Sequence, residues 1–566
     1  MNNKKDQIYD SITKKQILFL FCVSGAIGFI IYAVCFGISF LNVTNDGWLL
    51  QGGDLMQHYV GWKAYRAAEW HFPIGMTDGL LYPAQTCVIF TDSIPLFAIF
   101  FKFLSPILPE TFQYFGIWGA MTFILMGGIS AIIFRKFTEN LWYCISGSLF
   151  FSFSPYVIQR MYAHTALAGN WIILLAIAIW IYKPFFHNFK RKTIAWTCLL
   201  VMGSLVHIYY IPMIMVFMIF SCFQDLLENN GWAMDLVMGG IAIVADLAVL
   251  YCVGAFSVTS SMEAGGLGEY SSNLNTFFNQ LGRGRFLPRL PQNPGQDEGY
   301  GYLGLGILIL LGIACIVLIV DLIKKFIKKE INFSRNQGIL FLIREHSFFI
   351  SMVLAWIVIL ILALSPVITY NNKTVLEISY PNKIIELLSI FRASGRFIWC
   401  DCYILMFLAI SICIKKIPWT HVALGTVLIA ACIQIADLKD FALAKGASLL
   451  ANSRQNIIVS ERWEALAEGK KHLTYLPFSI IKTSYDDDTV YEFANFAIDH
   501  GMTVNYYTAA RVDIPALEAQ DLQVRQSLSA GEKNTDTLYI LDVPETGEAY
   551  GMTVENVDGI YVGYFR

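Results

Sequence analysis

Long runs of apolar residues, separated by short polar segments, occupy most of the chain as far as residue 436. Each run has about 17 to 25 residues, enough for an α-helix to cross a hydrocarbon core about 30 Å thick. The pattern predicts about eleven membrane-spanning helices. Nine of them are expected at about 16–42, 112–134, 141–157, 166–184, 193–207, 209–226, 235–256, 347–366 and 420–436. The other two are the eighth span in chain order, which ends at Lys324, and the tenth, which ends at Lys415.

One further apolar segment, residues 93–108, is too short to cross a membrane. Prolines bound it at Pro95, Pro106 and Pro109, and proline ends or restricts a helix. A helix that dips into the membrane or lies at its interface fits this segment better than a span.

Basic clusters follow the predicted spans in a regular way. They include Lys4-Lys5, Arg135-Lys136, Lys190-Arg191-Lys192, Lys324-Lys325 with Lys328-Lys329, and Lys415-Lys416. With about eleven spans, all of these clusters fall on one side, which the positive-inside rule makes cytoplasmic. The N-terminus is therefore expected in the cytoplasm, and the long segments 43–110 and 257–301 are expected outside.

From Asp437 onward the pattern becomes that of a soluble protein. Residues 472–477 and 537–542 are typical of buried strands, and 490–500 is typical of an amphipathic helix that ends at Gly501. The prediction is an all-α polytopic membrane bundle over 1–436, followed by a small extracytoplasmic α/β domain over 437–566.

Composition supports a membrane protein, because 56% of the residues are hydrophobic and only 15% are charged. Membrane lipids are therefore expected partners. The net charge is −3 and no basic stripe is present, so no nucleic-acid partner is expected.

The first candidate chemistry is the pair Asp54 and His58, just after the first span. Four residues apart, they share one face if the segment after Gly53 is helical. Asp54 is a candidate base for an attacking hydroxyl, with His58 orienting or tuning it. Asp46 is its nearest competitor, and Gln57 is a neighbouring polar group. The alternative is that Asp54 and His58 cap a helix or bond the loop to itself.

Three other external segments carry paired polar groups. They are Arg160 with His164, Glu298 with Tyr300, and Arg392 with Arg396. The arginines suit phosphate, because guanidinium presents a planar fork of hydrogen-bond donors. The alternative is that an arginine at a helix end only places its charged group at the membrane interface. Glu298 and Tyr300 are candidates to bind acceptor hydroxyls or to order their loop. We predict that these groups converge on one cavity.

Several short motifs follow one another along the first 436 residues. They are Gly52-Gly-Asp54-x-x-Gln57-His58, Trp70-His-Phe-Pro73, Tyr82-Pro83, Phe90-Thr-Asp92-Ser93, Glu298-Gly-Tyr300 and Ser394-Gly-Arg396-Phe397. Their order resembles the GT-C superfamily of integral-membrane glycosyltransferases, and more narrowly an uncharacterised bacterial branch of it, over about residues 1–436.

The resemblance implies an enzyme of the bacterial cytoplasmic membrane that takes a sugar from a polyprenyl-phosphate donor. Its acceptor would be an extracytoplasmic glycan or polymer of the cell envelope. In that superfamily a carboxylate of the first external loop acts as the base on the acceptor or positions it, and the match here is Asp54. From their residue types, Arg160 and His164 are candidates either to contact the donor or to pack within the structure. Some superfamily members hold a divalent metal with a second-loop carboxylate. Here no carboxylate lies between Ser154 and Trp171, so a divalent metal is possible but not favoured, and the sequence indicates no certain cofactor.

Two other classes of function remain open at this stage. A carrier or flippase of lipid-linked sugars predicts matching halves and ionisable groups along a midplane path. The sequence has no internal repeat, and Asp246 is the one carboxylate near the middle of a predicted span. A non-catalytic envelope scaffold predicts that the C-terminal domain binds a partner.

Overall fold

The computed structural model describes residues 14–183, 185–186, 188–258, 267–327, 339–451, 454–478 and 485–566. The basic clusters at Lys4-Lys5 and Lys328-Lys329 lie outside these residues.

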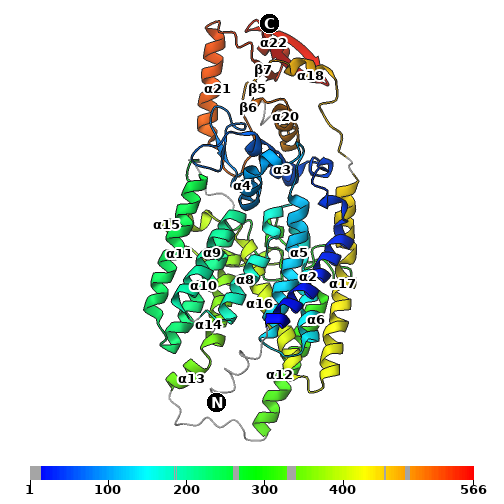
Figure 1. Cartoon of the computed structure of the whole chain (residues 1–566), viewed down its shortest axis with the longest axis vertical. Coiled ribbons are helices and arrows are strands. Elements are labelled where there is room, and N and C mark those ends of the chain that lie inside the picture. The colour runs from blue at the N-terminus through cyan, green and yellow to red at the C-terminus, as the bar shows by residue number, and fades with distance from the viewer. Residues whose placement is uncertain are drawn as a thin grey trace.

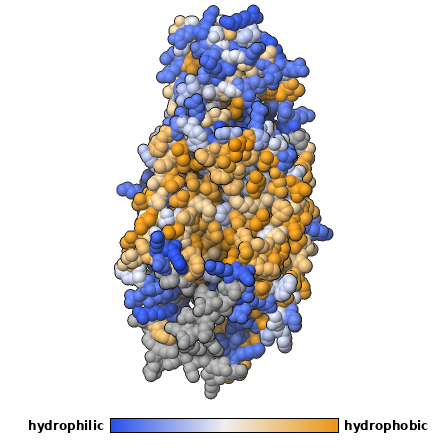
Figure 2. Space-filling model, in the orientation of Figure 1, coloured by the Kyte–Doolittle hydropathy of each residue, from blue (hydrophilic) through white to orange (hydrophobic). Residues whose placement is uncertain are grey.

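A bundle of apolar helices forms the larger part of the molecule, and a small mixed domain sits at one end of it (Figure 1). Figure 2 shows a broad apolar band across the visible face of the bundle, with hydrophilic surface on the small domain and toward the opposite end. Such a band is expected of a surface that faces lipid. Nine helical segments of the described chain are long and apolar enough to cross a membrane. They are α2 (Lys14–Phe36), α5 (Phe115–Arg135), α6 (Leu141–Ser152) with α7 (Pro155–Arg160), α10 (Tyr210–Glu228), α11 (Trp232–Val253), α12 (Leu305–Ile327), α14 (Ser347–Leu364), η6 (Ser394–Phe397) with α16 (Ile398–Lys416), and α17 (Thr420–Leu450).

The other two predicted spans are also helical but are less suited to crossing a membrane. Helix α8 (Trp171–Ile181) has only 11 residues, about 17 Å of helix. Helix α9 (Phe189–Val206) has 18 residues but begins with Lys190, Arg191 and Lys192. The short segment at 93–108 contains the nine-residue helix α4 (Pro95–Phe103), which is too short to cross.

Helix α17 continues well beyond the boundary expected at residue 437. It has 31 residues, about 46 Å of helix, and ends at Leu450. Asp437 and Gln434 are buried within it and bind the start of α12: Asp437 accepts from Tyr302, and Gln434 accepts from the Gly306 amide. The polar residues after 436 therefore extend a helix before the small domain begins.

The C-terminal domain is built on a five-stranded mixed sheet with the order β6-β5-β7-β9-β8. Strands β5 (His472–Leu476), β6 (Thr503–Val504) and β7 (Thr537–Leu541) are parallel, with α20 (Asp487–Asp499) and α21 (Ile514–Ser529) as crossovers. Strands β8 (Thr553–Val557) and β9 (Ile560–Tyr564) complete the sheet as an antiparallel pair. The predicted strands at 472–477 and 537–542 and the helix at 490–500 are thus present.

The hydrophobic core of this domain is shared with the first long loop. Helix α3 (Gly53–Ala67) contributes Met56 and Val60, which pack in one cluster with Trp463 and Phe493 of the domain. Backbone bonds add to the contact, since the amide of Tyr82 donates to the Val504 carbonyl. The domain is therefore fixed to the loop that carries Asp54.

Replacing Met56 by Ala should weaken this contact. Met56 is 2% exposed, and truncating a buried methionine typically costs about 2 to 5 kcal/mol of unfolding free energy. We expect thermal unfolding at a lower temperature and faster proteolytic release of residues 455–566. Ile107→Ala is the control, because Ile107 is 80% exposed. Equal effects of the two changes would contradict the shared core.

Candidate functional site

A cavity of about 500 Å³ lies where the helical bundle, the loop that carries α3 and the C-terminal domain meet. Asp54 and Gln57 line it from α3, and Asp92 lines it from the loop before α4. The bundle supplies His164, His207, Arg392 and Arg396, and the domain supplies Tyr491 and residues 508–512. The cavity thus brings together polar groups from segments far apart in the sequence.

The start of α3 positions Asp54 at the cavity. Gly52 and Gly53 have positive φ values of 94° and 62°, which glycine adopts without strain. The Gly53 amide then donates to the Asp488 carboxylate at 2.6 Å. Asp54 is in the first helical turn, where the helix dipole favours a carboxylate. The acidic run 486–488 therefore works as an attachment point in addition to capping α20 through Asp486.

A close approach at Gly61 brings Asp92 to α3. A Cβ atom at Gly61 would lie 2.4 Å from Thr91, so only glycine allows the 90–93 segment to lie this close to the helix. Ser93 donates from its hydroxyl to the His58 carbonyl at 2.7 Å. Asp92 adopts φ 55°, an uncommon conformation for a residue other than glycine, and such conformations concentrate at functional sites.

Asp92 lies between two histidines. Its Oδ2 is 3.3 Å from His58 Nε2, and its Oδ1 is 3.4 Å from His207 Nε2. His207 Nδ1 accepts from the Tyr209 amide, so Nε2 carries the proton of a neutral ring and faces Asp92 as a donor. Burial lowers the pKa of His207 to about 4, which keeps the ring neutral near pH 7. Burial raises the pKa of Asp92, but the opposing effect of His207 and His58 is larger. The pKa of Asp92 is therefore below its usual value, and the carboxylate is ionised.

Asp54 contacts a different histidine. Its Oδ2 is 3.2 Å from His164 Nε2, and its side chain is 45% exposed toward the cavity. Partial burial raises the pKa of Asp54 above its usual value, although His58 opposes this effect. Burial, together with Arg396 and Arg160, lowers the pKa of His164 well below its usual value. At neutral pH the pair is an accessible carboxylate beside a neutral imidazole.

Glu298 is the centre of an ion-pair cluster behind the cavity wall. Arg160 donates to both of its carboxylate oxygens, at 3.2 and 2.9 Å, and Arg396 donates through Nε at 2.7 Å. Burial raises the pKa of Glu298, but Arg396 and Arg160 lower it to well below the usual range. His164 Nε2 also lies 3.8 Å from this carboxylate. Glu298 therefore holds the two arginines and His164 in place.

Two glycines allow this cluster to form. Glu298 is in η5 (Gln296–Gly299), and Arg396 is in η6. A Cβ atom at Gly395 would lie 2.6 Å from the Cα atom of Gly299, so glycine at 395 is needed for the two turns to touch, while a Cβ atom at Gly299 would lie 2.6 Å from the Cα atom of Ser272. This contact explains why each charged residue has a glycine as its neighbour in the sequence.

The arginines at the cavity differ in how freely they can bind an anion. Arg160 and Arg396 are committed to Glu298. Arg392 and Arg511 line the cavity, and within the described residues neither forms an ion pair with a carboxylate. Arg392 lies 5.6 Å from the Tyr270 ring, and Arg511 lies 5.5 Å from the Phe90 ring. These two guanidinium groups are the available positive charges.

Some predicted site residues have different surroundings from those expected. Asp46 accepts from Tyr59 at 2.7 Å and does not line the cavity. Tyr300 is fully buried beneath Arg283, also away from the cavity. His58 is fully buried and faces Asp92, and the histidine in contact with Asp54 is His164. His58 still lowers the pKa of Asp54, so its role in orienting or tuning Asp54 stays a prediction. Helical spacing alone could not show these partners.

Several residues that line the cavity were not among the candidates found in the sequence, and Asp92, His207 and Arg511 are the charged or titratable ones that matter most here. Asp92 belongs to one of the short motifs noted above, but nothing local indicates that it meets two histidines. His207 follows an apolar run and Arg511 belongs to the C-terminal domain. Only the packing of distant segments brings them to the cavity.

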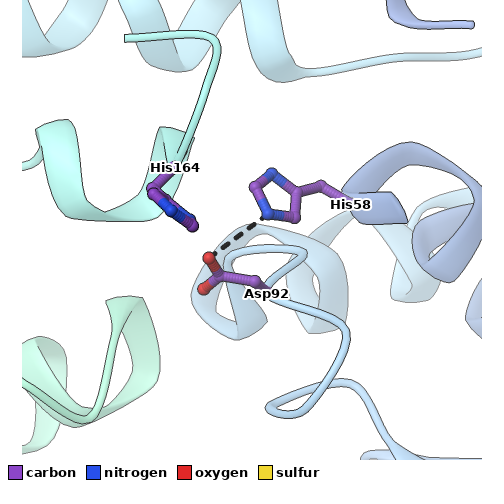
Figure 3. A group of neighbouring side chains, drawn as sticks. All are labelled: His58, Asp92 and His164. Carbon is purple, nitrogen blue, oxygen red and sulfur yellow. Dashed lines mark ion pairs between the residues drawn. The ribbon is translucent and has the colours of Figure 1, made fainter. Parts of the chain in front are cut away.

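Three of these side chains also present atoms that suit a metal ion. His58, Asp92 and His164 each offer one nitrogen or oxygen, and the three atoms lie within 4.8 Å of one another. Figure 3 shows the three side chains pointing toward a common point from three different segments.

The fold and cavity define a multi-pass membrane protein with a polar site beside a small α/β domain. The chain belongs to a family described as "domain of unknown function (DUF6311)", whose model matches residues 25–439. A second model, the DUF6311 C-terminal domain, matches residues 462–565. No curated protein matches the chain. The boundary between the two matches, residues 439–462, contains the end of α17, after which the C-terminal domain begins.

The ion-pair cluster generates a stability prediction. Replacing Glu298 by Gln removes the counter-charge of buried Arg160 and of Arg396, whose side chain is 12% exposed, and breaking a buried pair costs about 3 to 5 kcal/mol. Thermal unfolding of the purified protein in detergent should show a markedly lower midpoint. Glu269→Gln is the control, because Glu269 is an exposed carboxylate.

The same substitution has an expected pH dependence. The folded-state pKa of Glu298 is lowered from its usual 4.5, so its contribution is fully present above pH 4.5 and is lost as the pH falls through the lower, folded-state pKa. The gap in midpoint between the wild type and Glu298→Gln should therefore narrow in acid. A gap that stays constant from neutral pH to strong acid would contradict this charge state.

Proposed function

We propose that this protein is a membrane glycosyltransferase of the GT-C type. It moves a sugar from a polyprenyl-phosphate donor to an extracytoplasmic glycan or polymer of the cell envelope. The observation that carries the proposal is that Asp54 and Arg392 line one cavity, together with Arg396, whose guanidinium is paired with Glu298. The transfer needs a proton acceptor for the attacking hydroxyl and cations for the departing phosphate, and this cavity offers both.

The residues divide the reaction between them. Asp54 takes the proton from the acceptor hydroxyl, and the oxygen of that hydroxyl forms a bond to the anomeric carbon. The bond from that carbon to the phosphate oxygen breaks, and its electron pair leaves with the polyprenyl phosphate. Arg392, with no carboxylate partner among the described residues, stabilises the new negative charge. A single displacement of this kind inverts the anomeric configuration.

The edge of the cavity supports a donor with a lipid tail. Ile208 and Ile390 line the cavity beside its charged groups. Ile390 follows α15 (Asn382–Ser389), where Ile384 and Leu387 are 42% and 64% exposed. An apolar chain can lie against this surface while its phosphate reaches Arg392.

The proposed topology has about eleven spans, with the N-terminus in the cytoplasm and the C-terminal domain outside. The positions of the basic residues support it. Arg135 and Lys415-Lys416 end α5 and α16, and both helices run away from the end of the bundle that carries the C-terminal domain (Figure 1). Outside the cytoplasm, where nucleotide sugars are absent, a lipid-linked donor is the available sugar source.

Replacing Asp54 by Asn should abolish transfer. Loss of a general base typically lowers the rate by about 10² to 10⁴-fold. The measurement is mass spectrometry of envelope glycans from cells that lack the protein and are supplied with the wild type or the variant. Asp78→Asn is the matched control, because Asp78 is an exposed carboxylate of the same loop.

The contradicting results are distinct. Normal glycans with Asp54→Asn would remove Asp54 from the chemistry. Loss of product with Asp46→Asn, when Asp54→Asn is active, would move the base to Asp46. Substrate counterflow in proteoliposomes without any acceptor would favour a transporter. Deleting the C-terminal domain is a poor test for a scaffold, because the deletion also removes a wall of the cavity.

Replacing Arg392 by Gln should weaken donor use with little change in folding, because Arg392 is exposed and unpaired with any described carboxylate. A hydrogen bond to a charged group contributes about 1.5 to 3 kcal/mol, so KM for the donor should rise about 10- to 100-fold. Arg392→Lys should recover part of this loss because it keeps the charge. An unchanged KM for Arg392→Gln would place the phosphate elsewhere.

A further inference from the structure

We propose that His58, Asp92 and His164 bind one divalent transition-metal ion of the Zn²⁺ class at the wall of the cavity. The proposal concerns a binding site and does not depend on the transferase activity. Its three ligands come from α3, from the loop before α4 and from the turn after α7 (Figure 3).

The strongest observation is the state of His58. Its side chain is fully buried, yet neither Nδ1 nor Nε2 has a hydrogen-bond partner among the described residues. Buried polar atoms without a partner are uncommon, because losing their contact with water costs free energy. Nε2 faces Asp92 Oδ2 at 3.3 Å, but the contact does not have hydrogen-bond geometry. A metal ion between Nε2 and Oδ2 would satisfy these two atoms, and Nδ1 would still have no partner among the described residues.

The distances fit a coordination site. Bonds of about 2.1 Å from zinc to nitrogen or oxygen place tetrahedral ligands about 3.4 Å apart. The separation of 3.3 Å between His58 Nε2 and Asp92 Oδ2 matches that edge. The three donor atoms lie within 4.8 Å of one another, so inward movements of less than about 1 Å each close the site.

The surroundings support the three ligands. His207 Nε2 lies 3.4 Å from Asp92 Oδ1, on the side where an outer partner lies in metal sites, so Oδ2 is left to face the ion. Near the donors, the carboxylates of Asp54, Asp92 and Glu298 outnumber the guanidinium groups of Arg160 and Arg396. These carboxylates attract a dication, although Arg392 and Arg511 also line the same cavity.

The donor set also selects the kind of metal. Two imidazoles and one carboxylate suit Zn²⁺ and similar transition metals, whereas Mg²⁺ and Ca²⁺ prefer oxygen ligands. Asp92 and His164 line the cavity, so a fourth coordination position would face it. An open position of this kind is typical of zinc sites that exchange a ligand.

The test uses the full-length protein, purified in detergent through an affinity tag without histidine and then stripped with a chelator. Co²⁺ is added while visible ligand-field absorption is recorded, and Zn²⁺ is then added as a competitor. We expect one equivalent of Co²⁺ per chain, displaced by Zn²⁺ and not by Mg²⁺. X-ray absorption of the Zn²⁺ form should show imidazole ligands at about 2.0 to 2.1 Å.

The variants separate this site from incidental binding. His164→Gln is the first variant, because this side chain is 26% exposed and its replacement is the least disruptive; Asp92→Asn is the second. Each should abolish the stoichiometric binding. His207→Gln should weaken binding about 10- to 100-fold, as expected for an outer partner. His421→Gln is the control, because His421 is exposed on α17, and it should bind as the wild type does.

Any of three results would overturn the proposal. The first is that the wild type does not bind one equivalent of Co²⁺ tightly. The second is equal Co²⁺ binding by the wild type and His164→Gln. The third is that Mg²⁺ displaces Co²⁺ as effectively as Zn²⁺ does. The wild-type result alone decides the matter if a variant fails to fold. Because no sugar donor or acceptor is present, the outcome is independent of the proposed transfer.

Discussion

The bond between Glu298 and its two arginines is the constraint on which the site depends. It joins Arg160, which lies 138 residues away in the sequence, to Arg396, which lies 98 residues away. A buried ion pair adds little net stability, because desolvation offsets most of the attraction. Its main effect here is on position: it fixes the turn that carries His164, and His164 in turn contacts Asp54.

A second constraint acts from the other side of the cavity. The Asp488 carboxylate accepts from the first amide of α3, and Met56 and Val60 of the same helix pack into the core of the C-terminal domain. The domain therefore helps to determine where Asp54 lies, and it also contributes Arg511 and Tyr491 to the cavity wall. Bundle, loop and domain act as one unit around the site, although the two family matches divide the chain between them.

The arrangement combines an accessible carboxylate, two guanidinium groups without carboxylate partners among the described residues, and a buried group of histidines around Asp92. Asp54 and Arg392 suit proton transfer and phosphate binding, while His58, Asp92 and His164 suit a metal ion. The two sets of residues are adjacent but distinct, since Asp54 contacts only the exposed edge of the histidine group through His164.

The sequence by itself determined which segments become apolar helices and which residues carry useful chemistry, because hydrophobic periodicity and side-chain type are local properties. It placed the helices of the bundle, the strands β5 and β7 and the candidates Asp54, Arg392 and Arg396. It did not show that α17 continues to Leu450 or that Asp46 and Tyr300 lie away from the cavity. Only the tertiary structure decided that His58 meets Asp92 and that His164 meets Asp54, because such contacts depend on close packing at Gly61, Gly299 and Gly395 between segments that no helical or strand period connects.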